Sequence, residues 1–167
     1  MTDGYEKAMA VLPHGHPMIL VDRVESIETG RRIVALKAIT ASEPCYGHIT
    51  PDVAASHFAY PISLLIESFA QAAAILWLES RGGNSLRRAV FFVGMRGCTS
   101  EAPALPGDVL RHVACVDKMT QDAVVVSGET HSARGRVLEV LEMTARLAPE
   151  DADGSEAYGL QAVKGRL

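Results

Sequence analysis

Three polar side chains, Ser63, Glu67 and Gln71, recur at intervals of four residues within a long apolar segment. If this segment is a helix, they share one face and form a polar stripe that faces a common site. Burial disfavours the charged form of a carboxyl group, so Glu67 would have the raised pKa that a general acid needs at neutral pH. The structural alternative is a solvated helix edge, or a buried glutamate that only holds the packing together.

Two histidines precede this carboxyl group in the chain. His48 and His57 lie 19 and 10 residues before Glu67, in a segment that leads into the apolar stretch. Either could act as a base, because an unperturbed imidazole has a pKa of about 6.5. The free N–H groups of the first helical turn could polarise a carbonyl oxygen. Together these features indicate acid/base chemistry beside a carbonyl group, although an isolated loop histidine is usually idle.

The chain has four further histidines, and none of the common cofactor motifs is present. His14 and His16 form a His-x-His pair between two prolines, but no third metal ligand is evident, so a rigid turn is favoured over a metal site. His112 and His131 fall in strand-like patterns and are expected at the surface or at an interface. The chain has no dinucleotide fingerprint, no phosphate-binding loop and no nucleophile elbow. We therefore expect neither a metal nor a nucleotide cofactor.

The elements that must position these residues follow from the pattern of apolar side chains. Residues 18–28 and 31–40 read as two strands of a hairpin with its turn at Thr29 and Gly30. After a long loop, residues 61–81 read as a helix of about 20 residues, with Pro61 at its first position and glycines after its end. A short additional helix is expected over residues 2–11.

From Leu86 onward the pattern changes to four strands separated by turns. An almost wholly apolar helix must be buried on most sides, and a curved antiparallel sheet wrapped around it would bury it. We therefore predict an α+β fold with one domain over residues 1–148 and a polar C-terminal tail over residues 149–167.

Composition excludes several classes of protein. A formal charge of −4 over 167 residues disfavours a nucleic-acid partner. Residues 58–78 approach the length of a membrane span, but the polar side chains inside them favour a core helix and no membrane. The three cysteines are odd in number and widely spaced, which disfavours both a disulfide framework and a zinc site. With no signal-peptide pattern at the N-terminus, we expect a cytoplasmic protein.

Three segments together resemble the 3-hydroxyacyl-[acyl carrier protein] dehydratases, a family with the hot-dog fold. They are LPHGHPMILVDRV (12–24), YPISLLIESFAQAAAIL (60–76) and FFVGMRGCTSEAPALPGD (91–108). The middle segment is similar to the helix of that family, including an acidic residue at Glu67 and a glutamine at Gln71. The resemblance covers roughly residues 12 to 147 in the same order.

The resemblance implies a homodimer whose two sheets pair edge to edge, with two active sites at the interface. In each site, a histidine of one subunit would remove a proton from C2 of a 3-hydroxyacyl thioester. The carboxyl group of Glu67 from the other subunit would help the 3-hydroxyl group leave as water. The substrate would be carried by the phosphopantetheine of an acyl carrier protein, or by coenzyme A, with its acyl chain in an apolar tunnel. Gln71, Ser63 and Ile62 are the expected substrate-binding residues.

The loop before the helix departs from the family pattern. The family places its histidine about 14 residues before the acid, whereas His48 lies 19 before Glu67, and a Phe-Pro-Gly sequence is replaced by residues 49–51. Ile62 also replaces the usual glycine after the proline at the helix start. Three interpretations stay open: a bulging loop restores His48 to its place, His57 takes its role, or the histidine role is lost.

The sequence thus predicts a dehydratase, or a dehydratase-like enzyme, that converts a 3-hydroxyacyl thioester on an acyl carrier protein into a 2-enoyl thioester. The divergent loop favours a specialised pathway such as polyketide synthesis. Two alternative functions stay open. One is a thioesterase in which Glu67 activates water, and the other is a non-catalytic protein that binds an acyl carrier protein or an acyl chain.

Overall fold

The computed structural model describes residue 6 and residues 10–49, 53–82 and 90–148. Its elements are one long helix, six strands and two short 3₁₀ turns. In chain order they are β1 (Arg23–Glu28), β2 (Arg32–Ala38), η1 (Pro44–Tyr46), η2 (Ala55–Phe58), α2 (Ile62–Ser80), β3 (Val90–Ser100), β4 (Val109–Met119), β5 (Ala123–Ser132) and β6 (Gly135–Leu147). The predicted order of two strands, one helix and four strands is confirmed.

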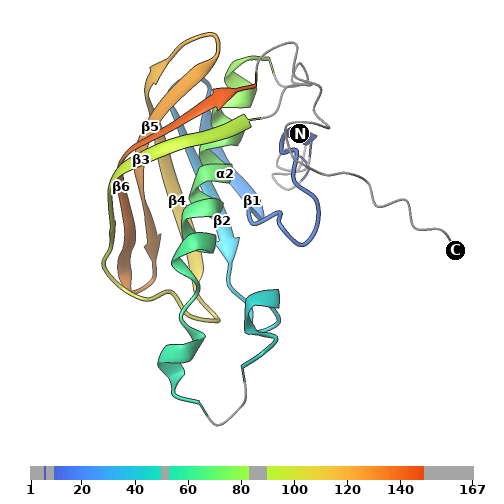
Figure 1. Cartoon of the computed structure of the whole chain (residues 1–167), viewed down its shortest axis with the longest axis vertical. Helices are drawn as coiled ribbons and strands as arrows, with labels where there is room; N and C mark the ends of the chain where they lie inside the picture. Colours follow the sequence, from blue (N-terminus) through green and yellow to red (C-terminus); the bar gives the residue numbers. More distant parts are fainter. Residues whose placement is uncertain (1–5, 7–9, 50–52, 83–89, 149–167) are drawn as a thin grey trace, which may run out of the picture.

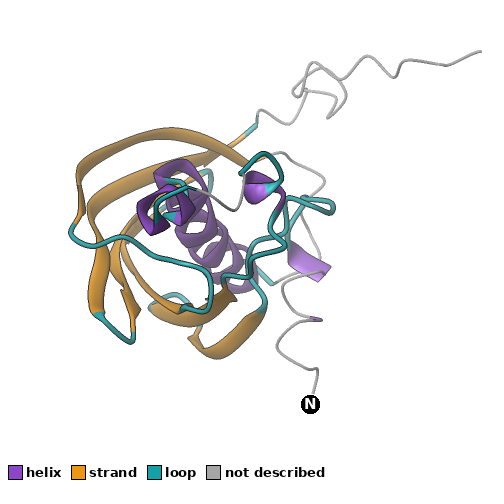
Figure 2. Ribbon diagram, turned by 90° about the horizontal axis from the view of Figure 1, so that it is seen from below, coloured by secondary structure: helices purple, strands orange, loops and turns teal. Residues whose placement is uncertain are grey.

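All six strands belong to one antiparallel sheet in the order β1-β2-β4-β5-β6-β3. The sheet curves around α2, which lies along its concave face (Figures 1 and 2). The expected hairpin joins β1 to β2, and Gly30 in its turn has a φ of 75°, a conformation that glycine adopts without steric cost. Although β3 follows the helix directly in the chain, it pairs only with β6 and forms one edge of the sheet.

Register shifts give the sheet its curvature. They occur in the pairings β1–β2, β3–β6, β4–β5 and β5–β6, whereas β2 and β4 pair without a shift. An extra residue on one strand bends that strand and increases its twist. The bulged strands can therefore bend around a cylinder, as a flat sheet could not.

The core lies between the concave face of the sheet and α2. Phe69, Ile75, Leu76 and Trp77 of the helix are fully buried there. By length and composition alone, residues Ser56–Ser80 could cross a membrane, but 56% of the apolar window is buried inside the fold. The burial agrees with the predicted core helix.

Two boundaries differ from the sequence-based expectation. Pro61 caps the helix instead of occupying its first turn, and its carbonyl accepts the first intrahelical bond from Leu65 N at 3.0 Å. β1 starts at Arg23. Before it, Met18 O and Leu20 N are hydrogen-bonded to the Gln71 side chain of the helix, and the end of β2 is bonded by the Asp22 side chain, which accepts from Ala38 N at 2.6 Å. The expected helix over 2–11 falls mostly outside the described residues, where Glu6, Ala10 and Val11 are helical, and the expected tail at 149–167 falls wholly outside them.

The prediction that His112 lies at the surface or at an interface is wrong. β4 is an interior strand, and its side chains at Leu110, His112 and Ala114 alternate toward the helix, so all three are fully buried. The His112 Nδ1 atom lies 2.8 Å from Thr130 Oγ1, and the ring meets Phe69 edge-on at 6.3 Å. Burial lowers the pKa of His112 to about 3, so the imidazole is neutral.

Candidate active site

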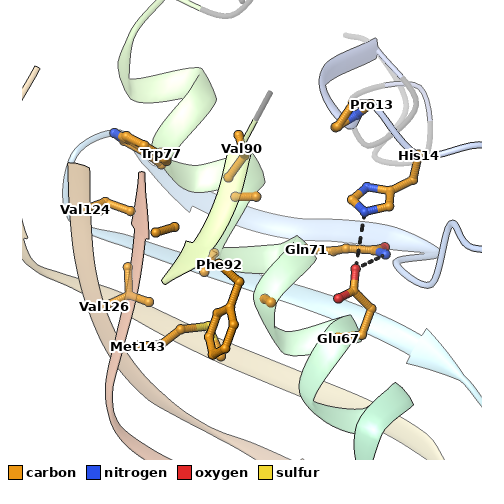
Figure 3. A pocket seen from close by; sticks show the side chains of 14 residues that line it. Pro13, His14, Glu67, Gln71, Trp77, Val90, Phe92, Val124, Val126 and Met143 are labelled. Atoms are coloured by element: carbon orange, nitrogen blue, oxygen red, sulfur yellow. Dashed lines mark hydrogen bonds and ion pairs between the residues drawn. The ribbon is translucent and has the colours of Figure 1, made fainter. Parts of the chain in front are cut away.

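Glu67 lies in the second turn of α2, and one of its carboxylate oxygens receives two contacts (Figure 3). Gln71 donates a hydrogen bond to Glu67 Oε1 from its Nε2 atom at 2.8 Å. His14 places its Nε2 atom 3.3 Å from the same oxygen. The Glu67 side chain is 35% exposed, so the carboxylate lies at the boundary between the protein interior and solvent. The predicted pairing of Glu67 with Gln71 on one helix face is confirmed.

Gln71 ties the N-terminal segment to the helix. It is 1% exposed, its Nε2 atom also donates to Met18 O at 2.8 Å, and its Oε1 atom accepts from Leu20 N at 2.9 Å. Both of its N–H groups are therefore used within the chain. Because Met18 and Leu20 are fixed to the helix in this way, the nearby His14 is held beside Glu67. Contact between Gln71 and substrate stays a prediction.

The electrostatics of Glu67 differ from the expectation. Its pKa is lowered, chiefly because His14 donates a hydrogen bond to the carboxylate, and this effect outweighs the desolvation that raises the pKa. The hydrogen bond from Gln71 lowers the pKa further. The expected rise in pKa is therefore wrong for this chain, because the prediction considered the apolar helix neighbours and not the donors that another segment supplies.

Next to this carboxylate is an apolar cavity of about 150 Å³ between the helix and the sheet (Figure 3). Among its described lining residues, the polar side-chain groups are those of His14, Glu67 and Gln71 and the indole N–H of Trp77. The apolar wall includes Trp77 of α2, Val90 and Phe92 of β3, Val124 and Val126 of β5, and Met143 of β6. Such a wall suits an alkyl chain whose polar end meets Glu67.

The other residues expected at the site lie elsewhere in the chain. Ser63 is exposed and does not line the apolar cavity, so the structure does not join it to Glu67 and Gln71. Ile62 is also exposed and lines a separate pocket with Pro61 and Ser100. The first turn of α2 is thus open at the surface, one turn before the carboxylate.

His48 and His57 are both exposed in the segment that precedes α2. His57 lies in η2, and His48 follows η1. Within the described part of the chain, neither histidine bonds to Glu67 or lines the apolar cavity.

Sequence reasoning missed His14 as the partner of Glu67. The available signal was its position in the motif at residues 12–24, which was interpreted as a rigid turn. On its other side, His14 borders a second, more polar cavity of about 370 Å³ that is also lined by His16, Asp22 and Glu43. Among the residues described, no three His, Cys, Asp or Glu side chains lie close enough together to hold a metal ion.

A single helix enclosed by a curved antiparallel sheet, with an acidic side chain beside an apolar cavity, defines a hot-dog protein. The fold matches a solved structure described as the dehydratase heterocomplex ApeI:P from Xenorhabdus doucetiae, with a TM-score of 0.67 and 16% identity. That match covers 86% of this chain and 91% of the other. At this identity the similarity establishes the fold alone.

Sequence comparison then identifies the family within the hot-dog fold to which this chain belongs. The model of the FabA-like domain matches residues 12–139. The 3-hydroxyacyl-[acyl-carrier-protein] dehydratase FabZ of Myxococcus xanthus is 34% identical over 154 residues, covering 88% of this chain and 93% of the relative. The FabZ of Granulibacter bethesdensis is 33% identical over 150 residues, covering 89% and 85%. This chain belongs to the FabZ-like 3-hydroxyacyl-[acyl-carrier-protein] dehydratase family.

Proposed function

We propose that this protein eliminates water from a 3-hydroxyacyl thioester on an acyl carrier protein and releases the 2-enoyl thioester. The observation that carries the proposal is the Glu67 carboxylate, which is fixed on the central helix at an apolar cavity in a chain of the dehydratase family. In this reaction, C2 loses a proton and the oxygen on C3 gains one. Glu67 and a histidine from the loop before α2 share these two transfers.

A homodimer would bring the loop histidine to the carboxylate. β3 is a sheet edge of 11 residues with Phe92 and Val93 each 57% exposed, and an uncovered apolar edge strand is a template for pairing. Phe92 also lines the cavity beside Glu67, so a second copy seated on this edge would help close the site. His48 and His57, which are exposed in one chain, are the candidates to act in the other.

The direct test is mass spectrometry of 3-hydroxybutyryl- and 3-hydroxyoctanoyl-acyl carrier protein after incubation with the protein. We expect the wild type to remove one water, and Glu67→Gln to lower the rate by at least about 100-fold, as is typical when an acid/base group is lost. Of the variants His48→Ala and His57→Ala, one should lose activity and the other should retain it.

The control is Ser63→Ala, one turn before Glu67 on the exposed part of the helix, which should keep the wild-type rate. If no water is lost on either chain length, the proposed reaction is wrong, and a carrier protein that still binds and keeps its acyl group unchanged identifies the protein as a binder.

Thioester hydrolysis is the second candidate, and a specific observation favours it. A carboxylate whose pKa is lowered is ionised at neutral pH and can take a proton from water as it attacks the thioester carbonyl. The same mass spectra separate the two reactions, because hydrolysis strips the acyl group from the carrier protein and dehydration keeps it attached.

The cellular location and the pathway of the reaction are a further part of the proposal. All three cysteines are free thiols, which supports a reducing, cytoplasmic location. The altered loop between β2 and α2 supports a substrate from a specialised pathway such as polyketide synthesis. Comparing rates on straight-chain and C2-methylated 3-hydroxyacyl carriers would test that assignment.

A further inference from the structure

A buried lysine lies where the segment with the two loop histidines leaves the sheet. This segment runs from the end of β2 to the start of α2 (Figure 1). On β2, Ile33 and Ala35 belong to the core, and Lys37 is the next residue on the same face of the strand. Lys37 is only 4% exposed. A lysine is almost never buried to this degree without a partner, because its ammonium group loses its hydration.

Glu43 is the partner of this lysine. The Lys37 Nζ atom donates to Glu43 Oε1 at 2.5 Å and to Ala38 O at 2.9 Å. The two side chains of the ion pair are only 6% and 12% exposed. Glu43 is the residue directly before η1. The ion pair therefore joins the end of β2 to the beginning of the turn that leads to His48.

Backbone hydrogen bonds connect Glu43 to His48 through three successive turns. Tyr46 N donates to Glu43 O at 2.9 Å, Gly47 N donates to the first residue of η1 at 3.1 Å, and Ile49 N donates to Tyr46 O at 3.0 Å. His48 lies within the last of these turns and is itself exposed. The position of its imidazole is therefore set through the backbone that Glu43 anchors.

The far end of the same segment also meets Lys37. The Lys37 Nζ atom lies 6.0 Å from the centroid of the Tyr60 ring, which is within the range of a cation–π contact. The rings of Tyr46 and Phe58 lie 6.1 Å apart. Tyr60 N donates to Ala104 O at 2.7 Å, which fixes this end to the connection between β3 and β4. Both ends of the segment thus converge on one ammonium group.

The type of interaction is informative because it is costly. Apolar side chains of similar volume would fill this space without the desolvation cost of two charges. They would, however, tolerate many arrangements of the loop. A charged hydrogen bond of 2.5 Å instead fixes both the distance and the direction between Lys37 and Glu43.

We propose that Lys37 and Glu43 are positioning residues, whose buried ion pair holds the loop before α2 so that His48 is presented to the substrate. This inference rests on the proposed dehydration, in which a histidine of this loop takes part in proton transfer. The pair acts through His48 and does not touch the substrate itself. It also selects His48 over His57, because the turns that start at Glu43 lead to His48.

The test uses the double variant Lys37→Met/Glu43→Leu. Each single change would leave one charge buried without its partner and would destabilise the fold strongly, whereas replacing both charges is often neutral for stability. The matched control is Arg111→Met/Glu25→Leu, which removes a more exposed ion pair of 3.0 Å between β4 and β1. Three properties are measured: the urea midpoint, kcat and KM with 3-hydroxybutyryl-acyl carrier protein, and the ¹⁵N order parameter of the His48 amide in the free protein.

We expect the Lys37→Met/Glu43→Leu variant to keep the wild-type urea midpoint and to lose about tenfold or more in kcat, with KM within about twofold. The order parameter of the His48 amide should fall from about 0.85 to below about 0.6. The control variant should change none of these properties. Wild-type kcat with an unchanged order parameter would show that the pair only stabilises the fold, and would overturn the proposal. A lowered kcat with an unchanged order parameter would also overturn it.

Coupling to the two histidines tests the route of the effect. If the ion pair acts through His48, adding His48→Ala to the double variant should give the same rate as His48→Ala alone, because one function cannot be lost twice. Losses that multiply, or coupling to His57→Ala instead, would contradict the assignment to His48. A wild type that removes no water rejects the proposed function, whereas the order parameter of His48 tests its positioning by the pair independently of turnover.

Discussion

The neutral imidazole of His112 makes the fold sensitive to acid. Its pKa is about 3 in the folded chain, against about 6.5 in an unfolded one, so between these values the unfolded state binds more protons. Stability is therefore complete above about pH 6.5 and falls as the pH drops toward 3. We expect this residue to contribute a loss of up to about 1.4 kcal/mol per pH unit in that window.

Urea unfolding at pH 7, 6 and 5 would measure this loss, with His112→Asn to remove the titration and His131→Gln as an exposed control. Asparagine keeps a polar group facing Thr130 and does not titrate, so this variant should show a flatter dependence than wild type and control. Equal slopes for all three proteins would contradict the assignment.

Individual residues of the site were predictable only where they lie close together in the sequence. Glu67 and Gln71 are one helical turn apart, so their spacing alone places them on one face. His14 is 53 residues before Glu67, and the bonds from Gln71 to Met18 and Leu20 hold its segment against the helix. Neither periodicity nor propensity encodes such a tertiary contact, and the same omission led to the wrong direction for the pKa of Glu67.

Among the elements, β5 depends on a glycine at one of its bulges. Gly128 pairs with Ala114 of β4, and a Cβ atom at this position would lie 2.0 Å from the carbonyl oxygen of Val113. A backbone atom in the middle of a sheet cannot move aside as a flexible side chain does. We expect Gly128→Ala to lower the free energy of unfolding by about 2–4 kcal/mol.

Thermal and urea unfolding would measure that loss beside Gly15→Ala, where an added Cβ meets nothing within 4 Å. The Gly15 variant should stay within about 0.5 kcal/mol of wild type. A Gly128 variant as stable as the Gly15 variant would show that the sheet relaxes at this bulge and that the close approach is unimportant.

The elements themselves were largely predictable, but their neighbours in the sheet were not. Apolar runs and turn residues located the hairpin at Gly30, the long helix and the last four strands. Alternation of apolar and polar residues indicates which face of a strand is buried, but it does not indicate which strand lies beside it. Nothing in the sequence near β3 therefore predicted that this strand pairs with β6 at the edge of the sheet. Likewise, the segment before β1 is bonded to Gln71, a residue about 50 positions away.

At the scale of the whole molecule, the proposed dimer predicts a particle of twice the 17.9 kDa chain. A Val93→Glu change on β3 would place like charges close together across a two-fold pairing of these edges. We expect this variant to run as a monomer in light scattering coupled to size exclusion, and to lose activity if the loop histidine comes from the partner. The matched control is Val109→Glu, on the interior strand β4 and 51% exposed, which should stay dimeric.

A wild type that elutes as a single 17.9 kDa chain would contradict both the dimer and the shared site. If the Val93→Glu variant is still a dimer, the interface lies on another surface. In that case no second copy covers Phe92 at the cavity.

The order of elements along the chain also has a consequence for folding during synthesis. The ribosome completes α2 when only β1 and β2 exist to cover it, and four of the six strands that enclose it are still unmade. At 5–20 residues per second, synthesis from the helix end to Leu147 takes roughly 3 to 13 seconds. Throughout that interval the most apolar stretch of the nascent chain lacks four of the six strands that enclose it in the fold, so part of its apolar surface has no partner until β6 emerges.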